Sequence, residues 1–166
     1  VAGEDLAETN ITGRGKYREI PIVIQDRGFN EDGSLFYPDT RAFFDGITGP
    51  YIPDTDISPL WNPEFFGNMM VVNGRTWPYL DVQPTRYRFR LLNGCNSRFL
   101  ILAMDSGTPF YQIGGDQGFL PAPVALNQLL MAPAERADVI VDFSSVPVGT
   151  TITLINLGPD EPFGGG

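Results

Sequence analysis

The sequence contains no histidine and a single cysteine, Cys95. Copper and zinc sites in proteins are built mainly from imidazole and thiolate ligands, and one thiol without any imidazole cannot complete one. The absence of histidine also excludes catalytic triads and acid–base schemes that depend on it. One cysteine cannot form an intrachain disulfide, so cysteine usage leaves the compartment open. We interpret Cys95 as a small residue at a strand end.

Basic residues are also few, with 11 Lys and Arg against 20 Asp and Glu and a net charge of −9. A field of this sign repels phosphate backbones and anionic lipid surfaces. No apolar run approaches the roughly 20 residues that a membrane-spanning helix needs. We therefore expect neither nucleic acid nor a membrane as a partner.

A sustained helical period is missing as well. Short strand patterns separated by turn signals recur instead, which is typical of an all-β Greek-key sandwich or barrel. The length of 166 residues suffices for one well-cored domain. We predict a linker over residues 1–15, the domain over 16–157, and a Pro/Gly-rich tail over 158–166.

The strand predictions rest on β-branched runs and on alternation with period two. The run from Ile20 to Ile24 is of the kind buried on both faces of a sheet. Asp32-Gly33 suits a tight hairpin turn, and Asn73-Gly74 predicts a type I′ turn. The expected strands cover residues 17–26, 35–37, 69–72, 77–82, 86–91, 99–104, 110–114, 137–143 and 150–156.

The segment from Pro38 to Pro63 is predicted to be a long Pro-rich loop, because its prolines remove ladder donors and disfavour helix. Loops of this length are uncommon in compact domains and tend to be functional or to pack on a neighbour. The residues that we expect at a contact between domains are Tyr51, Leu60 and Trp61.

Paired carboxylates are the remaining candidates for chemistry. Asp54 with Asp56, or Glu135 with Asp138, could serve acid–base work or bind a hard cation, as a carboxylate-based hydrolase would require. The spacing favours solvated loop acids for the first pair, which lacks the rest of a calcium loop. For the second pair it favours structural ion pairs or a turn cap.

Arginines at 86, 88, 90 and 98 could suggest an anion site, but the excess of acids favours pairing with carboxylates. The first three alternate with Tyr87, Phe89 and Leu91, which gives one strand a basic face and an apolar face. The residues to which we assign structural roles are Asn73, Gly74, Trp77, Arg88, Arg90, Glu135, Arg136 and Asp138.

Six strings in a fixed order carry a family resemblance. They are IVIQDR (22–27), NEDGSLFYP (30–38), VNGRTWPYL (72–80), RYRFRLLN (86–93), QIG (112–114) and APAERADVIVDF (132–143). In order and spacing they resemble the second cupredoxin domain of three-domain multicopper oxidases, in the branch of bilirubin oxidase, spore-coat laccase and phenoxazinone synthase. The resemblance covers nearly all of residues 16–163.

The resemblance implies a function for the parent protein. In that family the intact oxidase takes electrons from phenols, aminophenols, bilirubin or metal ions at a type 1 copper. It passes them to a trinuclear copper cluster that reduces dioxygen to water. Histidines and a cysteine of the first and third domains hold these coppers, and the middle domain carries none.

For this chain, the resemblance therefore implies no catalytic, cofactor-binding or metal-binding residue, and no activity in isolation. Its partners would be cupredoxin domains 1 and 3 of the same polypeptide. Family members generally continue beyond a segment like residues 158–162, which implies a further strand of the domain past Gly166. The alternative is a stand-alone β-sandwich that binds a carbohydrate or a protein. Neither the reducing substrate nor the oligomeric state follows from these residues.

Overall fold

The computed structural model describes residues 18–38, 64–160 and 163–164. Within these ranges the chain forms strands and no helix, so none of the described segments is a helix that could cross a bilayer. The strands are β1 (Glu19–Phe29), β2 (Leu35–Phe36), β3 (Met69–Val72), β4 (Arg75–Thr76), β5 (Arg86–Asn93), β6 (Leu100–Met104), β7 (Phe110–Gly115), β8 (Gly118–Leu126), β9 (Leu129–Met131), β10 (Arg136–Asp142) and β11 (Leu154–Asn156).

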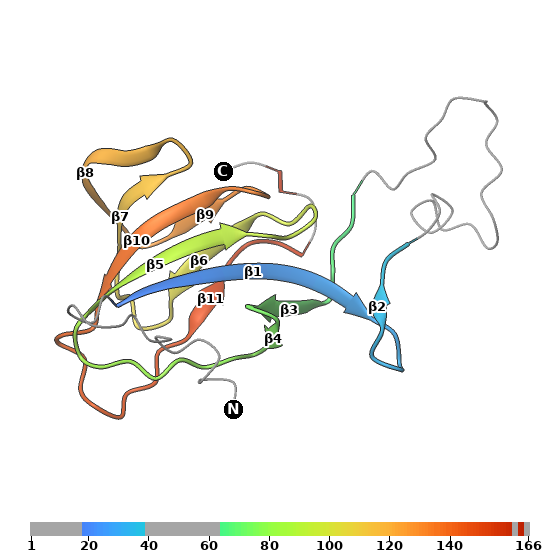
Figure 1. Cartoon of the computed structure of the whole chain (residues 1–166), viewed down its shortest axis with the longest axis horizontal. Helices are drawn as coiled ribbons and strands as arrows, with labels where there is room; N and C mark the ends of the chain where they lie inside the picture. The colour runs from blue at the N-terminus through green and yellow to red at the C-terminus, as the bar shows by residue number, and fades with distance from the viewer. Residues whose placement is uncertain (1–17, 39–63, 161–162, 165–166) are drawn as a thin grey trace, which may run out of the picture.

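The strands form two sheets. The larger has the order β4-β3-β1-β5-β10-β7-β8, with β2 also paired to β1, and the smaller has the order β11-β6-β9. β1 and β5 run parallel, and the other pairings of the described strands are antiparallel. Figure 1 shows β1 running along the large sheet, with β2 at one end and the β7–β8 hairpin toward the other. Strands distant in sequence are thus neighbours, as the predicted Greek-key sandwich requires.

The core lies between the two sheets and follows from the alternation along the strands. The large sheet contributes the buried faces of β1, β5 and β10, and the small sheet contributes those of β6 and β9. Each large apolar side chain that is fully buried contributes about 1.5–3 kcal/mol to stability. The fully buried apolar side chains are Leu91, Leu100, Phe110, Met131, Val139 and Val141.

The type I′ turn at Asn73-Gly74 is confirmed, since both residues have positive φ, of 48° and 83°. In the β1–β2 hairpin only Gly33 has positive φ, and the turn spans the five residues between Phe29 and Leu35. The amide of Asn30 donates to the carbonyl of Ser34 at 2.9 Å. The hairpin is therefore present, with a wider turn than Asp32-Gly33 alone predicts.

Three strand predictions are wrong in detail. β1 is not buried on both faces, because Ile20, Ile22 and Ile24 are buried while Pro21 is exposed. Residues 77–82 form no strand, since β4 ends at Thr76. The strand expected over 150–156 is limited to β11.

Besides β4, which ends before the strand predicted over 77–82, two strands were not expected from the sequence. β8 contains two prolines, and proline normally argues against a strand unless it lies at an edge. β9 has only three residues, which is too short for a periodic pattern to stand out. Both are recruited by pairing, β8 with β7 and β9 with β6.

Candidate functional site

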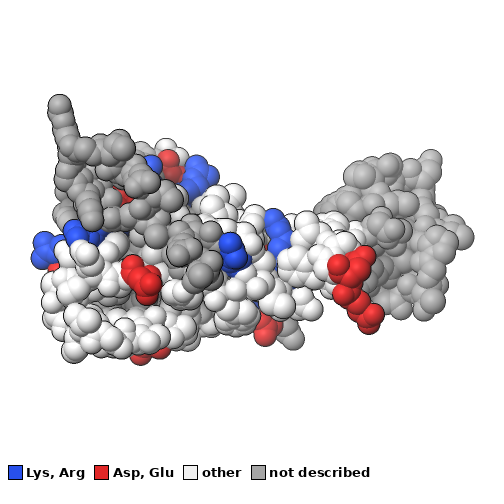
Figure 2. Space-filling view, turned by 60° about the horizontal axis from the view of Figure 1, so that its bottom comes forward, with Lys and Arg blue, Asp and Glu red and all other residues white. Residues whose placement is uncertain are grey.

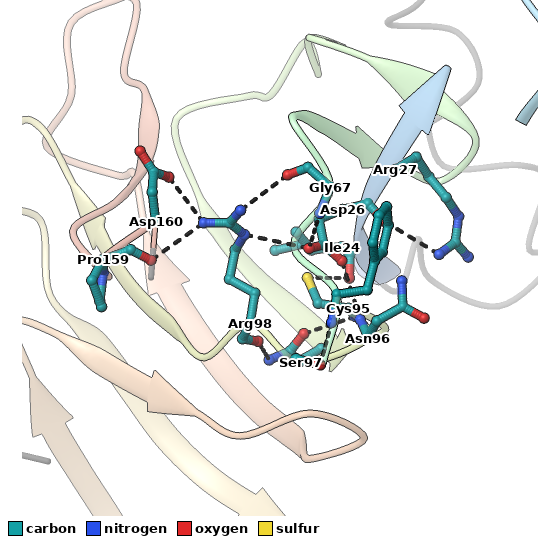
Figure 3. Close-up of polar contacts among 12 residues, drawn as sticks. Ile24, Asp26, Arg27, Gly67, Cys95, Asn96, Ser97, Arg98, Pro159 and Asp160 are labelled. Atoms are coloured by element: carbon teal, nitrogen blue, oxygen red, sulfur yellow. Dashed lines mark hydrogen bonds and ion pairs between the residues drawn. The ribbon is translucent and has the colours of Figure 1, made fainter. Parts of the chain in front are cut away.

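A buried polar cluster lies where the end of β1 meets the turn after β5 (Figure 3). Its centre is formed by Asp26, Asn93 and Arg98, whose exposed fractions are 0%, 0% and 6%. Burying charged and polar groups is costly unless each is paired or hydrogen-bonded. These residues therefore need their partners from several distant segments.

Asp26, near the end of β1, binds the backbone of two other segments. Its Oδ2 accepts a hydrogen bond from the amide of Gly67 at 2.8 Å, and its Oδ1 accepts one from the amide of Asn96 at 3.1 Å. Nε of Arg98 lies 3.5 Å from Oδ2. The buried carboxylate is thus compensated by two backbone donors and one guanidinium.

Arg98 connects the cluster to the C-terminal part of the described chain. One terminal nitrogen donates to the carbonyl of Pro159 at 3.2 Å and to Oδ1 of Asp160 at 2.9 Å. The other donates to the carbonyl of Gly67 at 3.0 Å. Nε has no hydrogen-bond partner among the described residues, since its contact with Asp26 is an ion pair only. The guanidinium therefore fastens three segments together.

Asn93 fixes the turn that presents Arg98. Its Nδ2 donates to the carbonyls of Arg98 and Met131, both at 2.9 Å, and its Oδ1 accepts from the amide of Cys95 at 3.0 Å. An amide side chain supplies both donors and an acceptor, which suits a turn with unpaired backbone groups. The turn after β5 is therefore held by a buried side chain.

Cys95 lies beside this cluster, with Sγ 3.8 Å from the carbonyl oxygen of Ile24. Burial, and then the negative charge of Asp26, raise the pKa of the thiol to about 12. A reactive or metal-binding cysteine must be a thiolate, and this one stays protonated. The sequence interpretation of Cys95 as a small buried residue agrees with its position in the core.

The donor set of the chain does not fit a copper ion. Imidazole and thiolate are common copper ligands in proteins, whereas this chain has no histidine, and its one thiol is protonated and lies beside a carboxylate engaged by Arg98. In the described ranges, no three residues of the ligating types His, Cys, Asp and Glu come together in an arrangement that could hold a metal ion. The contacts of the cluster join segments that lie far apart in the sequence.

The predicted structural residues Arg88, Arg90 and Asp138 share the outer face of the large sheet with Glu19. Arg88 Nε donates to Asp138 Oδ1 at 2.8 Å, and its Nη1 lies 3.1 Å from Glu19 Oε2. Arg90 also pairs with Glu19. The hydrogen bonds that Arg88 donates to Asp138 are the main cause that raises the pKa of Arg88. Pairing of these arginines with carboxylates is present as expected, and its structural importance stays a prediction.

Two further arginines, Arg86 and Arg136, also pair with carboxylates. Arg86 Nε lies 2.7 Å from Asp142, and Arg136 Nε lies 2.7 Å from Asp116. Figure 2 shows basic and acidic side chains in small groups separated by uncharged surface on the face in view. Among the described residues, the arginines expected to pair with carboxylates do so.

Glu135 and Asp138 do not form a catalytic pair in this arrangement. Oε2 of Glu135 accepts a hydrogen bond from the amide of Ala132 at 2.7 Å and so caps the turn before β10. Asp138 is engaged by Arg88. Nothing in these contacts supports the hydrolase hypothesis. The other candidate pair, Asp54 and Asp56, lies outside the described residues, as do Tyr51, Leu60 and Trp61.

The residues of the β3–β4 turn have different surroundings. Asn73 Oδ1 accepts from the amide of Val23 at 2.8 Å, and its Nδ2 donates to the carbonyl of Pro21 at 2.9 Å. Asn73 and Gly74 thus join the turn to β1. Trp77 is 81% exposed and has a φ of 52°. Its position therefore gives it little share in the core.

Sequence reasoning did not find the buried cluster as a unit. Asp26 and Asn93 lay within the resemblance strings, and Arg98 was expected to pair with an unspecified carboxylate. The available signal was the polar string Asn93-Gly94-Cys95-Asn96 directly after an apolar strand, which predicts a turn with side chain to backbone hydrogen bonds. Which carboxylate faces Arg98 depends on the packing of segments 72 positions apart.

The chain is similar to known multicopper oxidases. The laccase of Bacillus subtilis (strain 168) is 45% identical over 138 residues, which covers 83% of this chain and 25% of the relative. Multicopper oxidase LPR1 homolog 3 of Oryza sativa subsp. japonica is 42% identical over 143 residues, covering 85% of this chain and 25% of the relative. No protein-family model matches the chain.

Solved structures give the same result for the fold. The McoA multicopper oxidase from Aquifex aeolicus has a TM-score of 0.68 and 34% identity, covering 84% of this chain and 27% of that one. A laccase from Pediococcus acidilactici has a TM-score of 0.68 and 32% identity, and the match covers 87% of this chain and 27% of that laccase. The fold is therefore all-β and cupredoxin-like, and the chain spans about a quarter of the length of these relatives. Over the region that aligns, the chain belongs to the multicopper oxidase family.

Proposed function

We propose that this chain is the middle, non-catalytic domain of a multicopper oxidase and bridges two copper-bearing cupredoxin domains of the same polypeptide. Two observations together carry the proposal. The chain is similar to a segment that makes up about one quarter of the length of such an oxidase, and it contains no histidine. The lack of imidazole ligands and the protonated state of the one thiol support the proposal, because copper sites in proteins are built mainly from imidazole and thiolate.

In this proposal, the parent oxidase takes electrons from a reducing substrate such as a phenol, an aminophenol or bilirubin and reduces dioxygen to water. When bound by the outer domains, copper supplies the one-electron chemistry. The residues described here supply rigidity, because the paired arginines of β5 and the buried Asp26–Arg98 cluster hold strands and turns in fixed positions. A rigid bridge would keep the outer domains at constant separation.

The proposal is tested on the native gene product from its source. Intact mass gives the length of this product, and peptide sequencing shows whether it has a His-X-His string upstream and a His-Cys-His string downstream. Copper content and phenol oxidation are measured on the same material. We expect a chain about fourfold longer that binds copper and oxidises phenols, and a 166-residue chain that does neither. A native product that ends at these 166 residues would contradict the proposal and favour the stand-alone binding module.

A further inference from the structure

β8 is an exposed strand without a polar side chain. Its sequence is GFLPAPVAL, and eight of its nine residues are exposed while the last is half-buried. Phe119 is 75% exposed and Val124 is 47% exposed. Single exposed apolar residues are common, but a whole apolar strand in contact with water marks a contact surface or an aggregation hazard.

β8 is also an edge strand. It pairs with β7 on one side, and no other strand of the described residues pairs with its second side. Figure 1 shows the β7–β8 hairpin at the end of the molecule away from β2. An exposed edge of this kind normally invites pairing with another chain, unless charges, prolines or a bulge prevent it.

The backbone of β8 is unsuited to such pairing. Pro121 and Pro123 have no amide hydrogen to donate, and the register with β7 shifts between Phe119 and Val124. A second copy of this chain would therefore lack donors in the middle of the strand. The surface is suited to contact through side chains, with an apolar partner surface packed against Phe119, Leu120 and Val124.

We propose that β8 is the surface on which another part of the same polypeptide packs. This inference rests on the proposed function, because it takes the partner from the remaining three quarters of a multicopper oxidase, which the aligned relatives possess beyond this region. The chemistry of the partner surface is apolar and uncharged, since β8 offers no group for an ion pair or a side-chain hydrogen bond.

One contact fixes part of this surface in advance. The guanidinium of Arg88 lies 5.7 Å from the centre of the Phe119 ring, and the same guanidinium pairs with Asp138 and Glu19. The ring is therefore oriented by an ion-pair network of the large sheet before any partner arrives. Because the Phe119 ring is already oriented, docking on it costs less conformational entropy.

The test compares the native gene product with the 166-residue chain by hydrogen exchange. We expect the peptide over residues 118–126 to exchange at least about tenfold more slowly in the native product. Val124→Asp should remove this protection and lower the Tm of the native product, while leaving the Tm of the 166-residue chain unchanged. The matched control is Val148→Asp, at a turn residue that is 90% exposed, which should change neither.

The outcomes separate this inference from the proposed function. A longer, copper-binding native product in which residues 118–126 exchange as fast as in the 166-residue chain would leave the proposed function intact and overturn the docking surface. Self-association of the 166-residue chain, seen as concentration-dependent sedimentation and abolished by Val124→Asp, would assign β8 to contact with a second copy. That result would also overturn the docking surface proposed here. A native product of only 166 residues would overturn both.

Discussion

Nε of Arg98 lies 3.5 Å from Oδ2 of Asp26, and both side chains are buried. Breaking a buried ion pair by removing one charge is more damaging than removing a surface pair, because the remaining charge keeps its desolvation cost. This relationship makes the stability of the domain depend on a residue pair that joins β1 to the segment between β5 and β6.

We expect Asp26→Asn to lower the free energy of unfolding by about 3 kcal/mol. The new amide would bring a donor toward the amides of Gly67 and Asn96, and Arg98 would lose its buried counter-charge. Urea denaturation of the 166-residue chain measures the change. Asp160→Asn serves as the control and should cost less than about 1 kcal/mol, because its side chain is 99% exposed. Equal losses for the two variants would contradict the assignment.

Gly67 is expected to tolerate no side chain. A Cβ at this position would lie 2.4 Å from the backbone nitrogen of Arg27 and 2.7 Å from the carbonyl carbon of Asp26. Since backbone atoms cannot move aside cheaply, Gly67→Ala should destabilise the chain by about 3 kcal/mol in urea denaturation. Gly164→Ala is the control, because its Cβ would meet no atom within 4 Å. It should change the free energy of unfolding by less than about 0.5 kcal/mol. A mild effect at Gly67 would argue against the close approach.

Cys95 is expected to resist thiol reagents in the folded state. With a pKa of about 12 against an ordinary value of 9.0, the thiolate fraction near pH 8 falls about a thousandfold. Labelling should therefore proceed only through unfolding, and urea should accelerate it. The chain has one cysteine, so the signal comes from a single site. Fast labelling without denaturant would contradict the burial of the thiol.

The same shift predicts a change of stability at alkaline pH. The folded-state pKa of Cys95 lies above the unfolded value, so its contribution is complete below about pH 9 and is lost as the pH rises toward 12. Replacing the thiol by Cys95→Ala should flatten this part of the pH profile of unfolding, measured against the unmodified chain. Parallel profiles for both chains would show that Cys95 does not contribute.

Trp77 has a backbone conformation that favours glycine, with a φ of 52° and an exposed side chain. We expect Trp77→Gly to be more stable than Trp77→Ala by about 0.5–1 kcal/mol in urea denaturation. Val148, which is exposed and is not among the residues with positive φ, should show the reverse order for its Gly and Ala variants. The same order at both positions would exclude backbone strain at Trp77 as the cause.

Alternation and turn chemistry made much of the sheet predictable. The pattern around Tyr87, Phe89 and Leu91 predicted both faces of β5, because one face of a strand must be apolar to be buried between sheets. Asn73-Gly74 predicted its turn because few other residues accept positive φ at both positions. β8 escaped prediction because its prolines argue against a strand and its apolar side chains remain in water.

By itself, the sequence determined which chemistry is excluded and where most strands lie. The lack of histidine depends on composition alone, and periodic burial depends on residues near one another in the chain. Tertiary structure decided which charges meet and which apolar surface stays open. Arg98 faces Asp26, and β8 lies at the edge of the sheet, because packing brings together segments that are distant in the sequence. A local sequence pattern carries no information about which distant segments will meet.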